Sequence, residues 1–235
     1  MRVNKHIAET GFCSRREADR LIAERRVTVN GIAAGVGAVV GEGDEVRVDG
    51  QAIKARTVKA GKRRHVYIVL NKPVGVTCTT ESSVKDNIVD FIGHEQRIFP
   101  IGRLDKDSEG LLILTNDGEL ANKVMHPSGG VIKRYEIILN RDYDPTLTPR
   151  LLKGAVEEGE HLRFKKVIRH PDNAAHLEIH LDQGRKREIR RLFEIFGFHV
   201  KTLRRFQIGG LVIRKMPLGD CRPLSRKEID SLFEN

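Results

Sequence analysis

The sequence predicts an α+β fold, in which a small N-terminal α/β module precedes a larger domain built on a mixed, mostly antiparallel central sheet. Two observations indicate this class. Several short apolar runs of the strand type follow one another after residue 66, with few long helical patterns between them. The chain of 235 residues is also long enough for one substantial core and one small accessory module.

Residues 1–56 are expected to form the small module, with two short helices followed by strands. A brief apolar stripe predicts the first helix, and Ser14 followed by Glu17 predicts a capping box that begins the second. Asn30-Gly31 then indicates a turn, and the valines beyond it alternate with charged neighbours as in a half-exposed strand. The module is therefore expected to place its helices ahead of a small sheet.

Residues 57–65 are expected to form a basic linker, and residues 66–235 the larger domain. Strands are predicted at residues 67–70, 111–115 and 176–181, where apolar runs end at turn signals or alternate strictly. One helix of this domain is predicted from the apolar stripe Ile189, Leu192, Phe193 and Phe196.

The formal charge of +10 and the pI near 9.7 point to a polyanionic partner. The excess is local, because residues 183–206 carry eight basic and two acidic side chains and residues 59–65 carry four basic ones. Such concentration favours a nucleic-acid contact over the alternative of a solvated surface.

The three cysteines are far apart and form no CxxC pair, which argues against a disulfide framework and a zinc module and favours a reducing compartment. The sequence shows no apolar signal core and no run of about 20 apolar residues, so a cytoplasmic protein without membrane contact is expected. A monomer is the expected oligomeric state.

Neither a metal nor a cofactor is expected. His176 and His180 have the spacing of a helical metal site, but their strand pattern would separate them by about 13 Å. Asp105 and Asp107 could form a paired-carboxylate site, although Asp107 is better explained by local hydrogen bonds in its loop. No G-x-x-x-x-G-K or strand-linked GxGxxG motif occurs.

The segment RVNKHIAETGFCSRREADRLIAERRVTVNG, residues 2–31, resembles the S4 RNA-binding domain. This resemblance implies RNA contacts by Lys5, Ser14, Arg15, Arg16 and Asn30. Cations in the first turn of a helix oppose its dipole, so Arg15 and Arg16 serve something other than helix stability. The alternative is a small capping module with charged faces.

A longer set of motifs resembles the S4-bearing family of ribosomal RNA pseudouridine synthases. Its members are GRLDKDSEGLLILTNDG at 102–118, NKPVG at 71–75, KRY at 133–135, QGRKREIRRLF at 183–193 and VKTLRR at 200–205. DNIVDF at 86–91 and FPIGRLDKDS at 99–108 further resemble the branch that acts on large-subunit RNA. Without this resemblance, an aspartate in a glycine-flanked loop would more often be a turn or cap residue.

The resemblance implies three catalytic residues. Asp105 is the catalytic carboxylate, which either attacks C1′ of the ribose or takes a proton from the sugar. Arg190 matches its ion-pair partner and lies on the flank of the apolar helix stripe, whereas Arg187 and Arg191 are expected further outward. Tyr135 matches a tyrosine that stacks on the uracil.

The same resemblance gives roles in holding the extruded base and the RNA. Arg103 matches a residue that fills the vacated position in the RNA helix, and Leu203 an apolar wall of the pocket. In the basic stretch, Lys186, Arg187 and Arg204 are expected to contact RNA.

The expected function is the isomerisation of uridine to pseudouridine in structured ribosomal RNA, with 23S RNA as the main expectation. The reaction breaks the N1–C1′ bond and forms a C5–C1′ bond without redox change, so it requires no cofactor. The alternatives are 16S RNA or tRNA as substrate, a non-catalytic RNA-binding ribosome-assembly factor, and an RNA glycosylase or nuclease.

Overall fold

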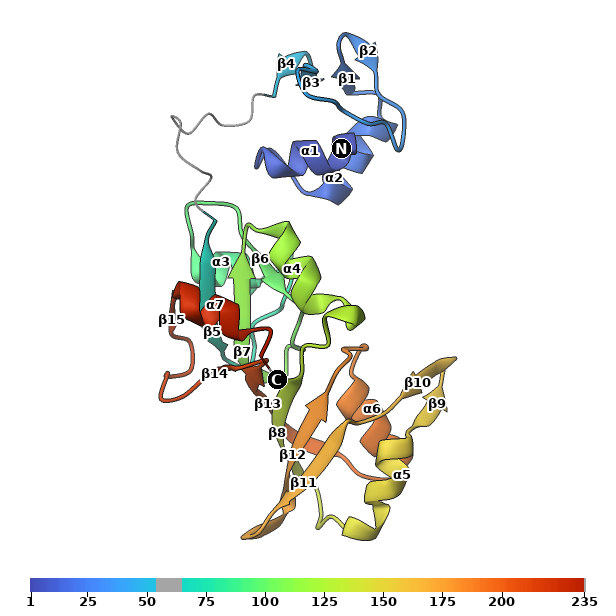
Figure 1. Cartoon of the computed structure of the whole chain (residues 1–235), viewed down its shortest axis with the longest axis vertical. Helices are drawn as coiled ribbons and strands as arrows, with labels where there is room; N and C mark the ends of the chain where they lie inside the picture. Colours follow the sequence, from blue (N-terminus) through green and yellow to red (C-terminus); the bar gives the residue numbers. More distant parts are fainter. Residues whose placement is uncertain (54–64, 235) are drawn as a thin grey trace. The chain divides into compact units, whose positions relative to one another are not determined.

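The computed structural model describes residues 1–53 and 65–234, and the chain divides into two compact units, Met1–Arg64 and His65–Asn235 (Figure 1). The expected linker at 57–65 lies outside the described residues except for its last residue. None of the described helices combines the length and apolar character needed to cross a membrane.

The first unit contains two short helices and a small antiparallel sheet. The helices are α1 (Val3–Glu9) and α2 (Arg15–Ala23). The strands are β1 (Val27–Val29), β2 (Ile32–Ala33), β3 (Val46–Val48) and β4 (Gln51–Ala52), and their order in the sheet is β2-β1-β3-β4. The Ser14 side chain caps α2 by accepting a bond of 3.0 Å from the Glu17 amide. The Glu17 carboxylate pairs with Arg20, so only the N-cap half of the predicted capping box forms.

The second unit is built on one large sheet, whose strand order is β11-β12-β8-β13-β7-β5-β15, with β14 beside β13 and β6 beside β7 (Figure 1). In order along the chain, the strands of this sheet are β5 (Tyr67–Lys72), β6 (Phe99–Ile101), β7 (Glu109–Thr115), β8 (Lys133–Leu139), β11 (Lys166–His170), β12 (Asn173–Leu181), β13 (Val200–Ile208), β14 (Leu211–Val212) and β15 (Cys221–Pro223). Among the strand pairs described for this sheet, β13 with β7 is parallel and the others are antiparallel. The predicted α+β class with a mixed, mostly antiparallel sheet is confirmed.

Short helices complete this unit: α3 (Ile88–Ile92), α4 (Gly118–Met125), α5 (Thr148–Lys153), α6 (Glu188–Ile195) and α7 (Arg226–Ser231). Two 3₁₀ turns, Pro127–Gly129 and Pro145–Leu147, and the hairpin of β9 (Ala155–Glu157) with β10 (Glu160–Leu162) lie between them.

Helix α6 packs on one face of β8, β12 and β13 through the apolar stripe that the sequence predicts. Ile189, Leu192 and Phe193 are at most 4% exposed and share a core cluster with the alternating apolar side chains of the three strands. Strict alternation along a strand puts the intervening side chains on the opposite face. The sheet therefore has a packed face beneath α6 and a polar face behind it.

Candidate active site

The loop that carries Asp105 joins β6 to β7 and is held by a buried lysine. Lys72, at the end of β5, is fully buried, and its Nζ donates to the carbonyl oxygens of Pro73, Asp105 and Ser108 at 3.0, 3.1 and 2.7 Å. Burial lowers the pKa of Lys72, because the charged form loses hydration. These three bonds satisfy the ammonium donors and tie the loop backbone at Asp105 and Ser108 to the end of β5.

Two arginines meet the aspartates of this loop, in a different pairing from the expected one. Arg187 Nη1 lies 3.6 Å from Asp105 Oδ2 and 3.8 Å from Asp107 Oδ1. Arg190 Nη2 lies 3.1 Å from Asp107 Oδ2. The expected pairing of Arg190 with Asp105 is therefore wrong in this structure. Asp107, assigned only local hydrogen bonds from the sequence, also forms an ion pair.

The pairing follows from where each guanidinium is anchored. The Arg190 side chain is 7% exposed and donates from Nη1 to the Val200 carbonyl at 2.6 Å, beneath the loop, where Asp107 is the carboxylate that it meets. Arg187 was expected on the outward side of the helix. It is instead the left-handed N-cap of α6, with φ of 51°, so helical spacing does not set its direction.

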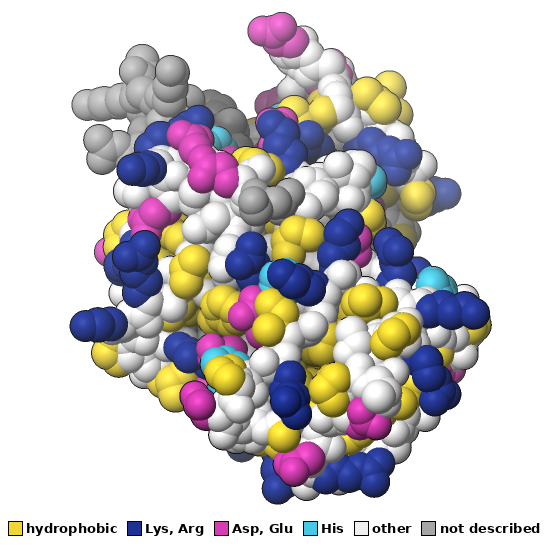
Figure 2. All heavy atoms as spheres, turned by 60° about the horizontal axis from the view of Figure 1, so that its bottom comes forward, with side chains coloured by type: hydrophobic (Ala, Val, Ile, Leu, Met, Phe, Trp, Pro, Cys, Tyr) yellow, Lys and Arg dark blue, Asp and Glu magenta, His cyan; other side chains and the backbone are white. Residues whose placement is uncertain are grey.

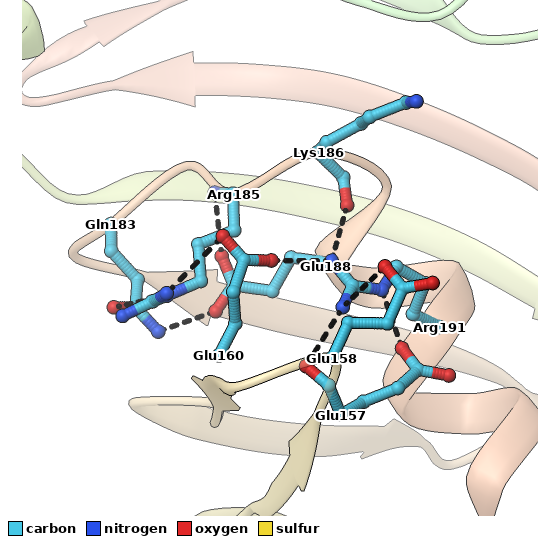
Figure 3. A network of polar contacts seen from close by, with 8 residues as sticks. All are labelled: Glu157, Glu158, Glu160, Gln183, Arg185, Lys186, Glu188 and Arg191. Atoms are coloured by element: carbon cyan, nitrogen blue, oxygen red, sulfur yellow. Dashed lines mark hydrogen bonds and ion pairs between the residues drawn. The ribbon is translucent and has the colours of Figure 1, made fainter.

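The segment that presents Lys186 and Arg187 is fixed by the polar network in Figure 3. Glu188, 2% exposed, accepts from the Arg185 amide at 3.1 Å and from Gln183 Nε2 at 2.5 Å. Burial raises the pKa of Glu188. Arg191 Nη1 also donates to the Lys186 carbonyl at 3.2 Å. The two basic side chains thus extend from a constrained backbone.

Arg191 is neutralised within the protein. Its guanidinium contacts Glu157 at 2.5 Å and Glu160 at 2.6 Å, and its side chain is 15% exposed. Arg190 and Arg205 are buried as well. The charge excess of residues 183–206 is therefore smaller at the surface than in the sequence. Figure 2 shows Lys and Arg side chains spread over the visible face between apolar patches.

Tyr135 lies in a row of three paired residues on neighbouring strands. It is 7% exposed in β8, opposite Arg205 of β13, which in turn pairs with Gly110 of β7. The Arg205 guanidinium is 6.0 Å from the Tyr135 ring centroid, and its Nε donates to the Leu111 carbonyl at 2.8 Å. Leu203 belongs to the same core cluster as Tyr135. Since β7 begins four residues after Asp105, this row lies beside the Asp105 loop in the sheet order.

Gly110 allows β7 to approach β13. Its φ is +108°, and a Cβ atom there would lie 2.2 Å from the Arg205 carbonyl oxygen. Only glycine tolerates this backbone and this contact. The residue therefore sets the junction between the Asp105 loop and the strand that carries Arg205.

The other expected contact residues of this unit are accessible. Arg103 and Lys186 are exposed. The Arg204 side chain is 34% exposed and contacts Glu136 at 3.5 Å.

In the first unit, the residues expected to contact RNA fall into two groups. Arg15 and Arg16 are exposed and make no ion pair with any residue in the described ranges. Lys5 pairs with Glu9 at 3.6 Å. Ser14 caps α2, and Asn30, with φ of 51°, bonds to Asp44 and to the Glu45 amide. Local structure alone thus accounts for Ser14 and Asn30.

Lys72, Arg205 and Gly110 are the residues that the sequence prediction did not assign to the site. Each lies within a motif quoted above, and the lysine interrupts an apolar strand, YIVLNK. A charged residue at the end of a buried strand indicates that its charged group is buried together with hydrogen-bond partners.

The chain matches the family model described as RNA pseudouridylate synthase over residues 66–194, and the S4 domain model over residues 1–46. It is 42% identical over 234 residues to a dual-specificity RNA pseudouridine synthase of Escherichia coli strain K12, covering 100% of this chain and 79% of the relative. It is 36% identical over 238 residues to ribosomal large subunit pseudouridine synthase B of Bacillus subtilis, covering 98% and 95%. A crystal structure of a pseudouridylate synthase is similar with a TM-score of 0.68 and 26% identity, covering 99% of both chains.

Proposed function

The chain belongs to the RNA pseudouridylate synthase family, and from this premise we propose that it converts uridine to pseudouridine in ribosomal RNA of the large subunit. The observation that carries the proposal is the fixed Asp105 loop, with the Arg187 guanidinium 3.6 Å from its carboxylate. The name of the Bacillus subtilis relative supports the large subunit. The dual-specificity name of the Escherichia coli relative supports a second RNA, of which tRNA is our candidate.

In the proposed reaction, the Asp105 carboxylate acts at the ribose. It either bonds to C1′ or takes a proton from the sugar, and in both routes the N1–C1′ bond breaks. The uracil then turns within the site and C5 bonds to C1′, while the Asp105–C1′ bond breaks in the first route or the sugar regains its proton from Asp105 in the second. The C5 proton is then lost and N1 gains one. Atoms and electrons balance without an external reagent.

The remaining site residues hold the base and the carboxylate. Arg187 supplies a positive charge beside Asp105, and Arg190 holds the loop from beneath through Asp107. Tyr135 and Leu203 would form the walls against the uracil, and Arg103 would fill the position that the flipped base vacates.

The RNA backbone would be bound by cations of both units whose side chains reach the surface. The proposed set is Lys5, Arg15 and Arg16 of the first unit and Lys186, Arg187 and Arg204 of the second. Ser14 and Asn30 remain in the proposal through the segments they shape. Each phosphate contact releases counterions, so binding should weaken steeply with salt. We propose that the protein acts as a monomer.

The test is incubation of the full chain with unmodified large-subunit RNA, small-subunit RNA and tRNA transcripts, followed by mapping of carbodiimide-resistant uridines. We expect a new pseudouridine in large-subunit RNA without strand loss. Asp105→Asn should lower turnover by a factor on the order of 10⁴ with RNA binding retained. Asp172→Asn, at an exposed turn, is the matched control. Free uracil, cut RNA, or a tenth of the activity in Asp105→Asn would refute the proposal.

A further inference from the structure

Three side chains with metal-ligating atoms meet on neighbouring strands of the large sheet. They are His170 at the end of β11, His176 of β12 and Glu136 of β8, and the strands follow one another in the sheet (Figure 1). One ligand atom from each lies within 4.8 Å of the other two. Among the described residues, this is the one group of three or more His, Cys, Asp or Glu side chains close enough together to hold a metal ion.

The strand register brings these residues together although they are distant in sequence. Arg169 pairs with Leu177, and the register then shifts so that His170 pairs with Asn173 near the turn of the β11–β12 hairpin. The His170 ring stacks on the His176 ring, with centroids 3.9 Å apart and planes 3° apart. Glu136 pairs with Glu178 and is thus the diagonal neighbour of His176. Diagonal neighbours are within reach of long side chains.

The cluster lies on the polar face of the sheet. Tyr135 and Leu177, the sequence neighbours of Glu136 and His176, are buried in the core beneath α6, so alternation places the cluster on the opposite face. All three ligand residues are half-buried. The cluster is therefore separate from the candidate active site, since the sheet lies between them.

We propose that His170, His176 and Glu136 bind one Zn²⁺ ion, with the fourth position open to water. Two imidazoles and one carboxylate suit a first-row divalent ion, whereas Mg²⁺ and Ca²⁺ prefer oxygen ligands alone. Ligand bonds of about 2.0–2.2 Å in tetrahedral geometry place ligand atoms roughly 3.4 Å apart. Because the three atoms lie within 4.8 Å of one another, they need to close by at most about 1.4 Å, which is within the range of side-chain rotation that separates the stacked rings.

One neighbouring cation competes with the metal. Arg204 Nη1 lies 3.5 Å from Glu136 Oε2, so its positive charge would lie close to a Zn²⁺ ion bound by this carboxylate and would repel it. Removing the competing charge with Arg204→Gln should therefore raise the affinity for Zn²⁺.

The test is calorimetric titration of the EDTA-treated, desalted full chain with zinc chloride. We expect saturable binding of one ion per chain, and a loss of more than about tenfold in affinity in His176→Ala and Glu136→Gln, since removal of even an outer partner of a ligand reaches that size. Equal melting temperatures of the variants and the parent in EDTA would show that they are folded.

Two variants serve as controls. His180→Ala removes a histidine on the same strand that bonds to Glu178, and Cys221→Ser removes an exposed thiol. Both should bind Zn²⁺ like the parent chain. Absence of one-to-one binding, unchanged affinity in His176→Ala and Glu136→Gln, or loss of binding in either control would overturn the proposal.

Discussion

Lys72→Met tests whether the buried ammonium holds the Asp105 loop. Methionine has nearly the same length, but it supplies none of the three hydrogen bonds to the carbonyl oxygens of Pro73, Asp105 and Ser108. Each bond from a charged donor contributes about 1.5–3 kcal/mol, and the desolvation of the buried ammonium offsets several kcal/mol of their sum. We expect a net loss of about 2–4 kcal/mol in the free energy of unfolding, or roughly 5–15 °C in melting temperature.

The effect on catalysis should exceed the effect on stability. A displacement of the carboxylate by about 1 Å costs on the order of 10² in rate, so single-turnover pseudouridine formation well below the melting temperature should fall by about that factor. Lys106→Met is the control, because Lys106 is 59% exposed and contacts Asp86 at 3.7 Å. If Lys72→Met kept the parent rate within twofold and the parent melting temperature, the loop would not depend on this lysine.

Three further changes follow from the site and the fold. Arg187→Gln should lower kcat by roughly tenfold, or about 1.4 kcal/mol, with partial recovery in Arg187→Lys; an unchanged single-turnover rate would exclude the role. Gly110→Ala should cost about 3 kcal/mol or more, because its Cβ would lie 2.2 Å from the Arg205 carbonyl; an unchanged melting temperature would contradict this. The hydrogen bond from Arg222 lowers the pKa of Glu228 from 4.5 to about 2. That stability is present above pH 4.5 and lost as the pH falls toward 2, so Arg222→Gln should flatten this acid limb in thermal melts recorded between pH 2 and 6.

The strands and helices were predictable because each has a recognisable pattern of apolar residues in its own stretch of sequence. The apolar run at Tyr67 to Leu70 became β5, and the alternation at His176 to Leu181 became part of β12. The sheet order was not predictable in the same way. Gly110 shows why, since the parallel pairing of β7 with β13 depends on a close contact with a residue 95 positions later.

The pairing of arginines with aspartates was beyond the sequence for a similar reason. The helical stripe correctly indicated that Arg190 lies at the edge of the buried face, and its side chain is 7% exposed. The stripe assumes regular helix from Arg187 onward, but Arg187 has left-handed backbone and precedes the helix. A change in the backbone of one residue thus redirected the guanidinium that meets Asp105.

The same reasoning explains why spacing along the chain did not place His176 beside His170. Comparing His176 with His180 correctly separates them, since both lie on one extended strand. The neighbour of His176 is instead His170, which a hairpin brings across from the adjacent strand. Ligand pairs in sheets form between strands, so a search along a single strand misses them whenever the register is unknown. The register decides which polar side chains share a face, and it gives this sheet a packed face beneath α6 and a separate cluster of nitrogen and oxygen ligands behind it.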